Sequence, residues 1–214
     1  MEFIDKDLQR YVEAHSEGES ELLKKINRET HVNVLRPRML SGHLQGRMLS
    51  MISHMIGPKY VLEIGTYTGY SALCLAEGMQ VDGKLVTIEV NEELEDRIRG
   101  YFNESEYSDQ LELHIGNAPD VVPTLAYEWD MVFIDADKSN YATYFDLVID
   151  RVTEGKFIVI DNVLWSGKVL EKNRSKLDKD TKAIIDFNQK VHEDERVSNV
   201  LFPVRDGIMI LRKN

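Results

Sequence analysis

The feature that most constrains the fold is an alternation, beginning near residue 60, of short apolar runs with amphipathic stretches. Seven runs have the length and composition of buried strands: Tyr60–Ile64, Lys84–Glu89, Leu111–Ile115, Met131–Ile134, Phe157–Ile160, Val200–Pro203 and Ile208–Leu211. Helix-like segments separate the first five of these runs: Tyr70–Gly78, Glu92–Phe102, Ala118–Leu125 and Tyr141–Arg151. This alternation predicts a mostly parallel sheet covered on both faces by helices.

The end of the chain departs from this rhythm. Only the four residues Val204–Gly207 join the last two apolar runs. A connection of that length is too short for a helical crossover and is typical of a hairpin. We therefore expect an α/β fold of the Rossmann-like, doubly wound kind, with a seven-stranded, mostly parallel sheet whose last strand is antiparallel.

The first 57 residues have a helical pattern, with Leu22, Leu23 and Ile26 at helical spacing, and Pro37 interrupts it. A further helix is expected from an N-cap at Ser41 to Ile56, where Gly57 and Pro58 end it. The length of 214 residues suits one domain. The prediction is a single domain over residues 1–214, in which the helical segment 1–57 packs on an α/β core of residues 58–214.

Composition limits the partners and the compartment. The net charge of −11 disfavours nucleic acid, because phosphates would be repelled overall. No apolar run approaches the roughly 20 residues that span a bilayer, so no membrane association is expected. The N-terminal segment lacks an apolar signal core, which favours a cytoplasmic protein. Cys74 is the single cysteine and is expected to be a buried small hydrophobe.

One basic cluster, Arg36-Pro37-Arg38, stands out in this acidic chain. It is either a solvated turn or a patch that meets an anionic part of a substrate.

A glycine turn follows the first predicted strand. Gly65 and Gly69 lie in the turn Glu63–Gly69, between that strand and a helix. Glycines let the backbone turn sharply and approach a ligand closely, and ligands of open α/β sheets bind beyond the carboxyl ends of the strands. The spacing is G-x-x-x-G instead of G-x-G-x-x-G, which disfavours a pyrophosphate cradle.

The second predicted strand ends in Glu89. An acid at this place can accept hydrogen bonds from both hydroxyls of a ribose. The alternative is an exposed carboxylate near a helix N-terminus, where acids are common. The glycine turn at the expected distance upstream favours the ribose interpretation.

Oxygen-bearing side chains follow the fourth and fifth predicted strands. Asp135 comes after one strand, and Asp161 and Asn162 come after the next. Parallel neighbours would bring them to the same edge of the sheet, as a site suited to Mg²⁺, Ca²⁺ or Mn²⁺. No His or Cys lies in this group, which disfavours zinc. Ordinary turn chemistry, in which Asp and Asn are common, is the alternative.

Lys138 stands three residues after Asp135, at the start of a predicted helix. A helix start is a poor place for a cation, because the helix dipole is positive there. A lysine next to a divalent cation can lose its proton more readily and act as a general base. Its position therefore suggests a function.

These residues resemble the cofactor motifs of class I methyltransferases, and more narrowly the metal-dependent caffeoyl-CoA and catechol O-methyltransferase group. The similarity rests on Leu62–Ser71, Thr87–Glu89, Asp135–Lys138 and Asp161–Trp165, and it extends from about Met39 to the C-terminus. The resemblance implies that S-adenosylmethionine is the cofactor. The residues that would contact it are Ser41, Glu63, Gly65, Thr66, Tyr67, Gly69, Ser71, Glu89, Ala118, Asp135 and Asp137.

The resemblance also implies the rest of the site. Asp135, Asp161 and Asn162 would bind the metal, Lys138 would be the base, and Trp165 would be a wall of the substrate pocket or else a core anchor. The implied reaction is methyl transfer to one hydroxyl of a vicinal diphenol, a small phenolic acceptor, by a homodimer. The polar stretch Lys168–Asp180 would be a mobile loop over the site.

Two other functions stay open from the sequence. A nicotinamide-dependent oxidoreductase is disfavoured by the missing G-x-G-x-x-G motif and by the terminal hairpin. A catalytically silent binding module on the same fold would be expected to lose the acidic cluster or Lys138, and both are present.

Overall fold

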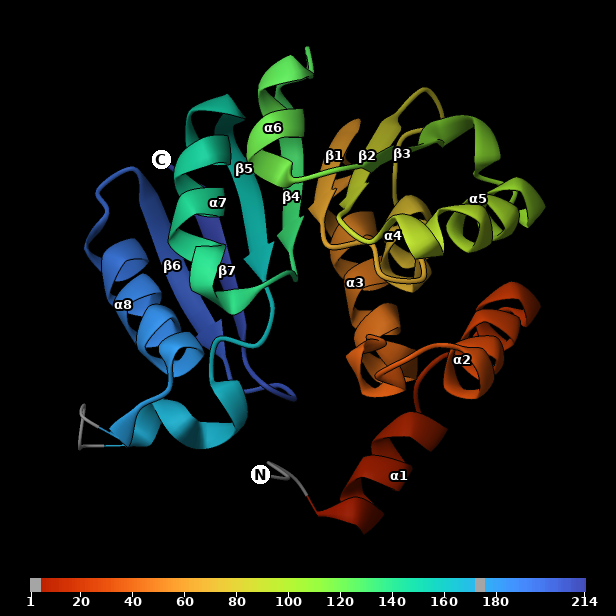
Figure 1. Ribbon diagram of the computed structural model, residues 1–214, viewed down its shortest axis with the longest axis horizontal. Coiled ribbons are helices and arrows are strands. Elements are labelled where there is room, and N and C mark those ends of the chain that lie inside the picture. Colours follow the sequence, from red (N-terminus) through yellow and green to blue (C-terminus); the bar gives the residue numbers. More distant parts are fainter. Residues whose placement is uncertain (1–4, 172–175) are drawn as a thin grey trace. The chain divides into compact units, whose positions relative to one another are not determined.

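The computed structural model describes residues 5–171 and 176–214 (Figure 1). The chain divides into two compact units, the first ending at Asn117 and the second running from Ala118 to Asn214. Each unit is an α/β arrangement with its own strands. The organisation as one domain over residues 1–214 stays a prediction.

The first unit begins with helices, as the sequence predicts. They are α1 (Lys6–Ala14), α2 (Glu21–Asn33), the 3₁₀ turn η1 (Pro37–Met39) and α3 (Gly42–Ile56). The side chain of Ser20 caps α2 by accepting from the Leu23 N–H, and Leu23, Ile26 and Thr30 form its buried face. The contacts of this face are with the α/β part of the same unit, because α2 packs against α4 and α5.

The two ends of α3 differ from each other in how well the sequence predicts them. Ser41 stands at the N-cap position, but its backbone is helical and its side chain makes no capping hydrogen bond within the described structure, so the predicted capping role is wrong. Gly57 ends the helix as predicted, with a left-handed φ of 57° and its N–H donating to the Ser53 carbonyl at 2.8 Å.

Three parallel strands form the sheet of the first unit, in the order β3-β2-β1. They are β1 (Tyr60–Ile64), β2 (Lys84–Glu89) and β3 (Leu111–Ile115), with the predicted bounds. The connections are α4 (Tyr70–Ala76), η2 (Glu92–Leu94) with α5 (Glu95–Glu104), and η3 (Ser108–Gln110). Every residue of α4 is buried, and the helix ends two residues before the predicted Gly78.

The second unit contains the other four strands, in the order β4-β5-β7-β6. Its elements are α6 (Ala118–Val121), η4 (Val122–Thr124), β4 (Trp129–Ile134), η5 (Lys138–Asn140), α7 (Tyr141–Val148), η6 (Ile149–Arg151), β5 (Val152–Ile160), η7 (Trp165–Leu170), α8 (Lys179–Glu193), β6 (Val197–Phe202) and β7 (Ile208–Lys213). β4 and β5 are parallel, whereas β7 is antiparallel to both β5 and β6. The predicted hairpin and the predicted fold class are confirmed.

Helices α7 and α8 lie side by side in this unit (Figure 1). The ring of Phe187 on α8 meets the rings of Tyr141 and Phe145 on α7 edge-on, with centroids 5.6 and 6.4 Å apart. Edge-to-face aromatic pairs of this kind fix ring orientation as well as bury apolar area. The start of α7 is therefore held firmly against α8.

Helix α8 is the main element that the sequence interpretation missed. Its buried residues Thr181, Ile184, Phe187 and Val191 have helical spacing, and Asp178 caps it by accepting from the Thr181 N–H. The mobile loop expected over Lys168–Asp180 is therefore wrong at its C-terminal end, because α8 starts at Lys179. At its N-terminal end residues up to Leu170 belong to η7, and the part at residues 172–175 lies outside the described residues.

The bounds of four strands also differ from the prediction. β4 and β5 begin earlier, at Trp129 and Val152, β6 runs from Val197 to Phe202, and β7 ends later, at Lys213. β6 stops before Pro203, which has no N–H to donate to the ladder. Within residues 5–171 and 176–214, no helix is both long and apolar enough to cross a membrane.

Candidate active site

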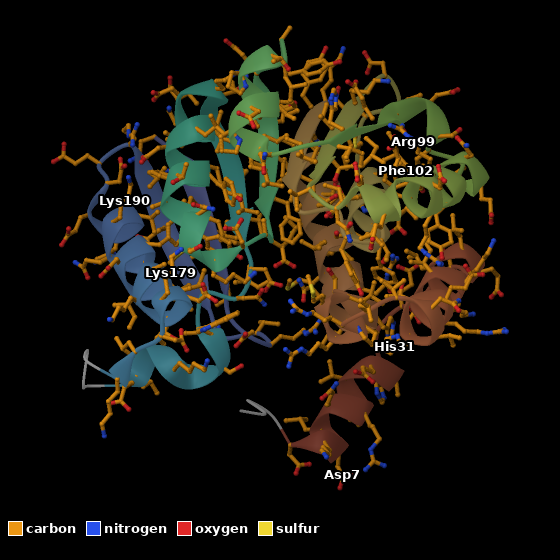
Figure 2. All side chains as sticks on the ribbon, viewed as in Figure 1. Asp7, His31, Arg99, Phe102, Lys179 and Lys190 are labelled. Atoms are coloured by element: carbon orange, nitrogen blue, oxygen red, sulfur yellow. The ribbon has the colours of Figure 1, made fainter. Side chains whose placement is uncertain are left out.

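The first unit contains the predicted glycine turn. Gly65, Tyr67 and Gly69 all have left-handed backbone, with φ of 104°, 51° and 84°. The Gly65 N–H donates to the Ile88 carbonyl at 3.0 Å, which joins the turn to the end of β2. A Cβ on Gly69 would lie 2.8 Å from the ring of Phe102, a residue labelled in Figure 2. The turn is therefore tight and requires glycine at this position.

Glu89 connects the end of β2 to this turn. One carboxylate oxygen accepts from the Tyr67 N–H at 2.7 Å and the other accepts from the Asn91 N–H at 2.9 Å. The residue is only 8% exposed, and this burial raises the pKa of Glu89 above its ordinary value although the backbone donors oppose the shift. Glu89 thus fixes the turn, and its role as a ribose ligand stays a prediction.

Other predicted cofactor residues of the first unit are buried. Glu63 lies inside β1, where its carboxylate accepts from the Thr87 hydroxyl, and Thr87 in turn pairs with the Thr66 hydroxyl. Ser71 is in the first turn of α4, and Ser41 is at the start of α3. Their contact with a cofactor stays a prediction.

The basic cluster lies close to the glycine turn. The Tyr67 hydroxyl donates to the Leu35 carbonyl at 3.0 Å, and Arg36, the next residue, has a left-handed φ of 59°. Arg36 and Arg38 are both exposed. The choice between a solvated turn and an anion-binding patch stays open.

The second unit contains the predicted acidic residues, which follow β4 and β5. Ile134 pairs with Ile160, so Asp135 and Asp161 leave their strands side by side, as predicted. The Lys138 amine donates to Asp135 at 2.8 Å and to the hydroxyl of Tyr141 at 2.7 Å. The Tyr141 hydroxyl donates to the backbone carbonyl of Asp161 at 2.9 Å. One connected group therefore links Asp135, Lys138, Tyr141 and Asp161.

This group is largely protected from solvent. The side chains of Lys138 and Asp135 are 10% and 18% exposed. Tyr141 is fully buried, and its burial, with smaller effects of Asp135 and Asp161, raises the pKa of Tyr141 well above its ordinary value. The Tyr141 hydroxyl therefore keeps its proton and remains a donor.

The predicted metal ligands have the right chemistry for a hard cation. Two carboxylates and an amide supply only oxygen ligands, which Mg²⁺ and Ca²⁺ prefer. Asp161 is buried and accepts from the Asn162 N–H at 2.7 Å, and Asn162 has a left-handed φ of 59°. The described residues contain no group of three or more His, Cys, Asp or Glu suited to a metal, and the predicted set has only two such residues. The residues present fit a cation that keeps several waters.

Trp165 lies near the same amine. Its ring centroid is 5.9 Å from Lys138 Nζ and 5.6 Å from Lys168 Nζ. It is half-buried, which favours a pocket wall over a core anchor. The strand-to-helix loop that carries it has left-handed backbone at Asn162, Trp165 and Ser166.

The hairpin turn between β6 and β7 holds this loop in place. The Leu164 N–H donates to the Asp206 carbonyl at 2.8 Å, and the Val163 N–H donates to the Gly207 carbonyl at 3.1 Å. The Asp206 carboxylate also accepts from the Ser166 N–H. Asp206 and Gly207 are structural supports that the sequence interpretation did not single out.

The remaining predicted cofactor residues are Asp137 and Ala118. The Asp137 carboxylate accepts from the Tyr144 hydroxyl and from the Asn140 amide, so it is held in one orientation. Burial of the Tyr144 ring, and then this contact with Asp137, raise the pKa of Tyr144. Ala118 is buried at the start of α6, after Gly116.

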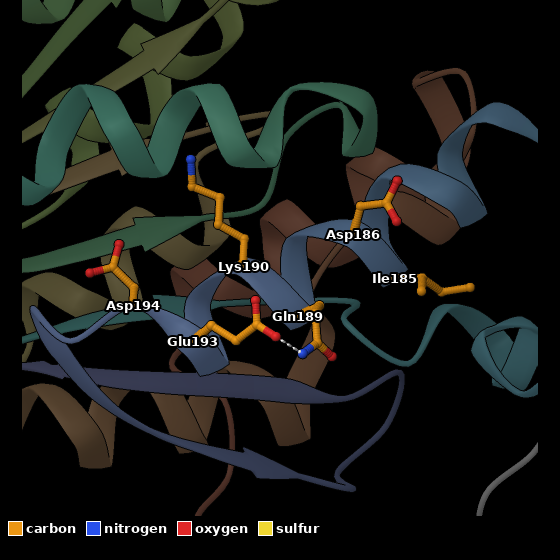
Figure 3. A pocket seen from close by; sticks show the side chains of 6 residues that line it. All are labelled: Ile185, Asp186, Gln189, Lys190, Glu193 and Asp194. Carbon is orange, nitrogen blue, oxygen red and sulfur yellow. Dashed lines mark hydrogen bonds between the residues drawn. The ribbon is translucent and has the colours of Figure 1, made fainter.

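A surface pocket on α8 is the alternative location for a site (Figure 3). Its six lining residues all come from α8 or directly follow it, and none is a predicted site residue: Ile185, Asp186, Gln189, Lys190, Glu193 and Asp194. Two of them are already paired with each other, because the Gln189 amide donates to Glu193. Lys190 forms an ion pair with Asp146 at 2.6 Å. This pocket lacks the chemistry of the cluster around Lys138.

The comparisons with known proteins identify the family of the chain. The chain matches the O-methyltransferase family over residues 12–214, and it belongs to that family. It is 30% identical over 208 residues to probable caffeoyl-CoA O-methyltransferase 2 of Dictyostelium discoideum, covering 95% of this chain and 90% of that protein. It is 32% identical over 179 residues to caffeoyl-CoA O-methyltransferase 5 of Nicotiana tabacum, covering 79% of this chain and 75% of that protein.

A solved structure of another O-methyltransferase has the same fold. The O-methyltransferase from Bacillus cereus in complex with SAH has a TM-score of 0.88 and 27% identity, covering 97% of both chains. The expected enzyme class, an S-adenosylmethionine-dependent O-methyltransferase, is thereby confirmed. Membership of this family decides against the nicotinamide-dependent oxidoreductase.

Proposed function

We propose that this enzyme transfers the methyl group of S-adenosylmethionine to one hydroxyl of a catechol-like small molecule, with the assistance of a divalent metal. The observation that carries the proposal is the part-buried contact of the Lys138 amine with Asp135 and Tyr141, at 2.8 and 2.7 Å. A part-buried amine beside a set of oxygen ligands would be suited to removing a proton from a hydroxyl.

The glycine turn and Glu89 would hold the cofactor. The buried Glu89 carboxylate, which accepts from the Tyr67 and Asn91 backbone N–H groups, would also accept from a ribose diol. The proposed contacts beyond the turn are those that the resemblance implies, including Asp137 and Ala118. Bound S-adenosylmethionine supplies a methyl group that a sulfonium makes electrophilic.

Asp135, Asp161 and Asn162 would hold the metal, most simply Mg²⁺, with Ca²⁺ or Mn²⁺ as alternatives. A divalent cation in this position supplies positive charge that makes an adjacent phenolic hydroxyl more acidic. Lys138 would accept the proton of the attacked hydroxyl, and Trp165 would orient the aromatic ring of the acceptor. Positioning the hydroxyl against the methyl group is the remaining contribution of the protein.

Turnover with a simple catechol and labelled S-adenosylmethionine tests this function. We expect methylation of the catechol, loss of activity on exhaustive chelation, and recovery on addition of Mg²⁺. Asp161→Ala should lose activity and keep cofactor binding by calorimetry, because Asp161 belongs to the metal set alone. Full turnover after exhaustive chelation would contradict the metal part of the proposal, and no methylation of any vicinal diphenol would contradict the substrate class.

Three further parts of the proposal rest on the resemblance and composition. We infer that the enzyme is a homodimer, is cytoplasmic and forms a single domain over residues 1–214. Sedimentation of the purified protein tests the dimer, and a single cooperative unfolding transition supports the single domain. Screening phenolic acceptors, including coenzyme A thioesters because two relatives are named for one, would identify the acceptor.

A further inference from the structure

We propose that Tyr141 is a positioning residue that aims the Lys138 amine at the acceptor hydroxyl. The inference rests on the proposed function, because it assumes that Lys138 takes part in proton transfer. The observation behind it is the chain of hydrogen bonds from Lys138 through Tyr141 to the backbone of Asp161.

The direction of this chain follows from the donors and acceptors. The backbone carbonyl of Asp161 can only accept, so the single hydroxyl proton of Tyr141 must point to it, across 2.9 Å. The Tyr141 oxygen then has lone pairs but no proton left for Lys138. It must therefore accept an N–H from the Lys138 amine, across 2.7 Å.

Besides its bond to the side chain, the Lys138 nitrogen has three tetrahedral positions, and hydrogen bonds occupy two of them. One N–H is directed at Asp135 and one at Tyr141, at 2.8 and 2.7 Å. The described residues provide no third hydrogen-bond partner for this nitrogen. Because the nitrogen is tetrahedral, fixing two positions and the side-chain bond leaves one direction for exchange of a proton with the acceptor.

The anchor itself is rigid. Tyr141 is only 1% exposed, and its ring meets Phe187 of α8 edge-on at 5.6 Å. Its hydroxyl is tied to the residue that begins the loop after β5, because the carbonyl it contacts belongs to Asp161. A base held only by Asp135 could rotate about that single contact, and Tyr141 removes this freedom. Reactivity is sensitive to displacements of this size, since errors of about 1 Å can lower rates by about 10²-fold.

Tyr141→Phe tests the inference, because it removes the hydroxyl and keeps the ring against Phe187. We expect kcat to fall about 10- to 100-fold, with KM for the catechol within about twofold and cofactor affinity by calorimetry unchanged. Tyr127→Phe is the matched control. It removes a hydroxyl in the same unit just before β4, and the whole strand separates it from Lys138. The control should keep wild-type turnover.

A double-mutant cycle with Lys138→Ala separates positioning from general structural damage. If Tyr141 acts through Lys138, adding Tyr141→Phe to Lys138→Ala causes no further loss of kcat. An equal loss in both backgrounds, or wild-type kcat in Tyr141→Phe, would overturn the inference. Wild-type turnover in Lys138→Ala would instead refute the proposed base, and with it the role of Tyr141.

Discussion

Gly207 offers a direct test of how the loop that carries Asn162 and Trp165 is held. Gly207 lies in the β6–β7 hairpin turn with a φ of 88°. A Cβ at this position would lie 2.4 Å from Leu164 Cγ and 2.8 Å from the Leu164 backbone nitrogen. Gly207→Ala therefore combines an unfavourable backbone conformation with a collision against the loop.

The size of the effect can be separated into these two parts. Placing a non-glycine residue in the left-handed region costs about 1–2 kcal/mol. Overpacking a well-filled interior costs about 1–3 kcal/mol more, and the backbone nitrogen of Leu164 cannot move aside as a side-chain end could. The sum is about 2–5 kcal/mol. In a chain of this size this corresponds to a fall in the thermal midpoint of roughly 6–15 °C, at about 3 °C per kcal/mol.

Gly155→Ala is the matched control, since Gly155 has a φ of 78° and a Cβ added to it would meet nothing within 4 Å. It should lose only the conformational part, about 1–2 kcal/mol. The assay is equilibrium unfolding of both variants in denaturant, with turnover measured in parallel. Equal stabilities of the two variants would refute the packing argument. Wild-type turnover in a clearly destabilised Gly207→Ala would refute the link from this turn to the loop of Trp165.

Three other predictions follow from single side chains. Glu89→Ala should weaken cofactor binding by on the order of 1.5–3 kcal/mol, the scale of a charge-assisted hydrogen bond; unchanged affinity by calorimetry would contradict the ribose role. Lys138→Ala should lose roughly 10²–10⁴ in turnover and Lys138→Arg should also fail, because arginine stays protonated; near-normal turnover of the arginine variant would show that only charge is needed. Hydrogen bonds from Thr181 and Lys168 lower the pKa of Asp178 from its ordinary 3.8 to about 2. The ionised carboxylate therefore stabilises the fold fully at pH values above 3.8, and this stabilisation is lost as the pH falls through about 2. The difference in thermal midpoint between wild type and Asp178→Ala should accordingly be full at pH 6 and shrink below pH 4, and a constant difference would contradict this assignment.

The first unit was the more predictable part of the fold. The apolar runs of β1, β2 and β3 are short and bounded by turn residues, so their limits are visible in the sequence. Ser41 shows where such reasoning fails. Its residue type and position are typical of a cap, but its backbone is already helical, and only the surrounding structure determines this.

In the second unit the element that the sequence interpretation missed is the charged helix α8. Lys179–Glu193 is polar over most of its surface, and its apolar positions Ile184, Phe187 and Val191 are few. Its helical spacing was nevertheless present and could have been counted. The supports at Asp206 and Gly207 were not predictable in the same way, because they act through contacts with a loop some 40 residues earlier, as in the Ser166–Asp206 hydrogen bond.

The chemistry of the cluster was more predictable than its geometry, for a physical reason. Lys138 and Tyr141 lie three residues apart at the start of η5 and of α7, so local helical geometry brings them together, and Asp135 lies in the short loop that joins β4 to η5. Asp161 joins them through the parallel register of β4 and β5, which alternating apolar runs already imply. What the sequence lacks is the direction of each hydrogen bond. That direction depends on the backbone carbonyl of Asp161, which faces the Tyr141 hydroxyl and is the same group in every residue type. Because of this contact, Tyr141 is not only a core aromatic residue but also the residue that we propose orients Lys138.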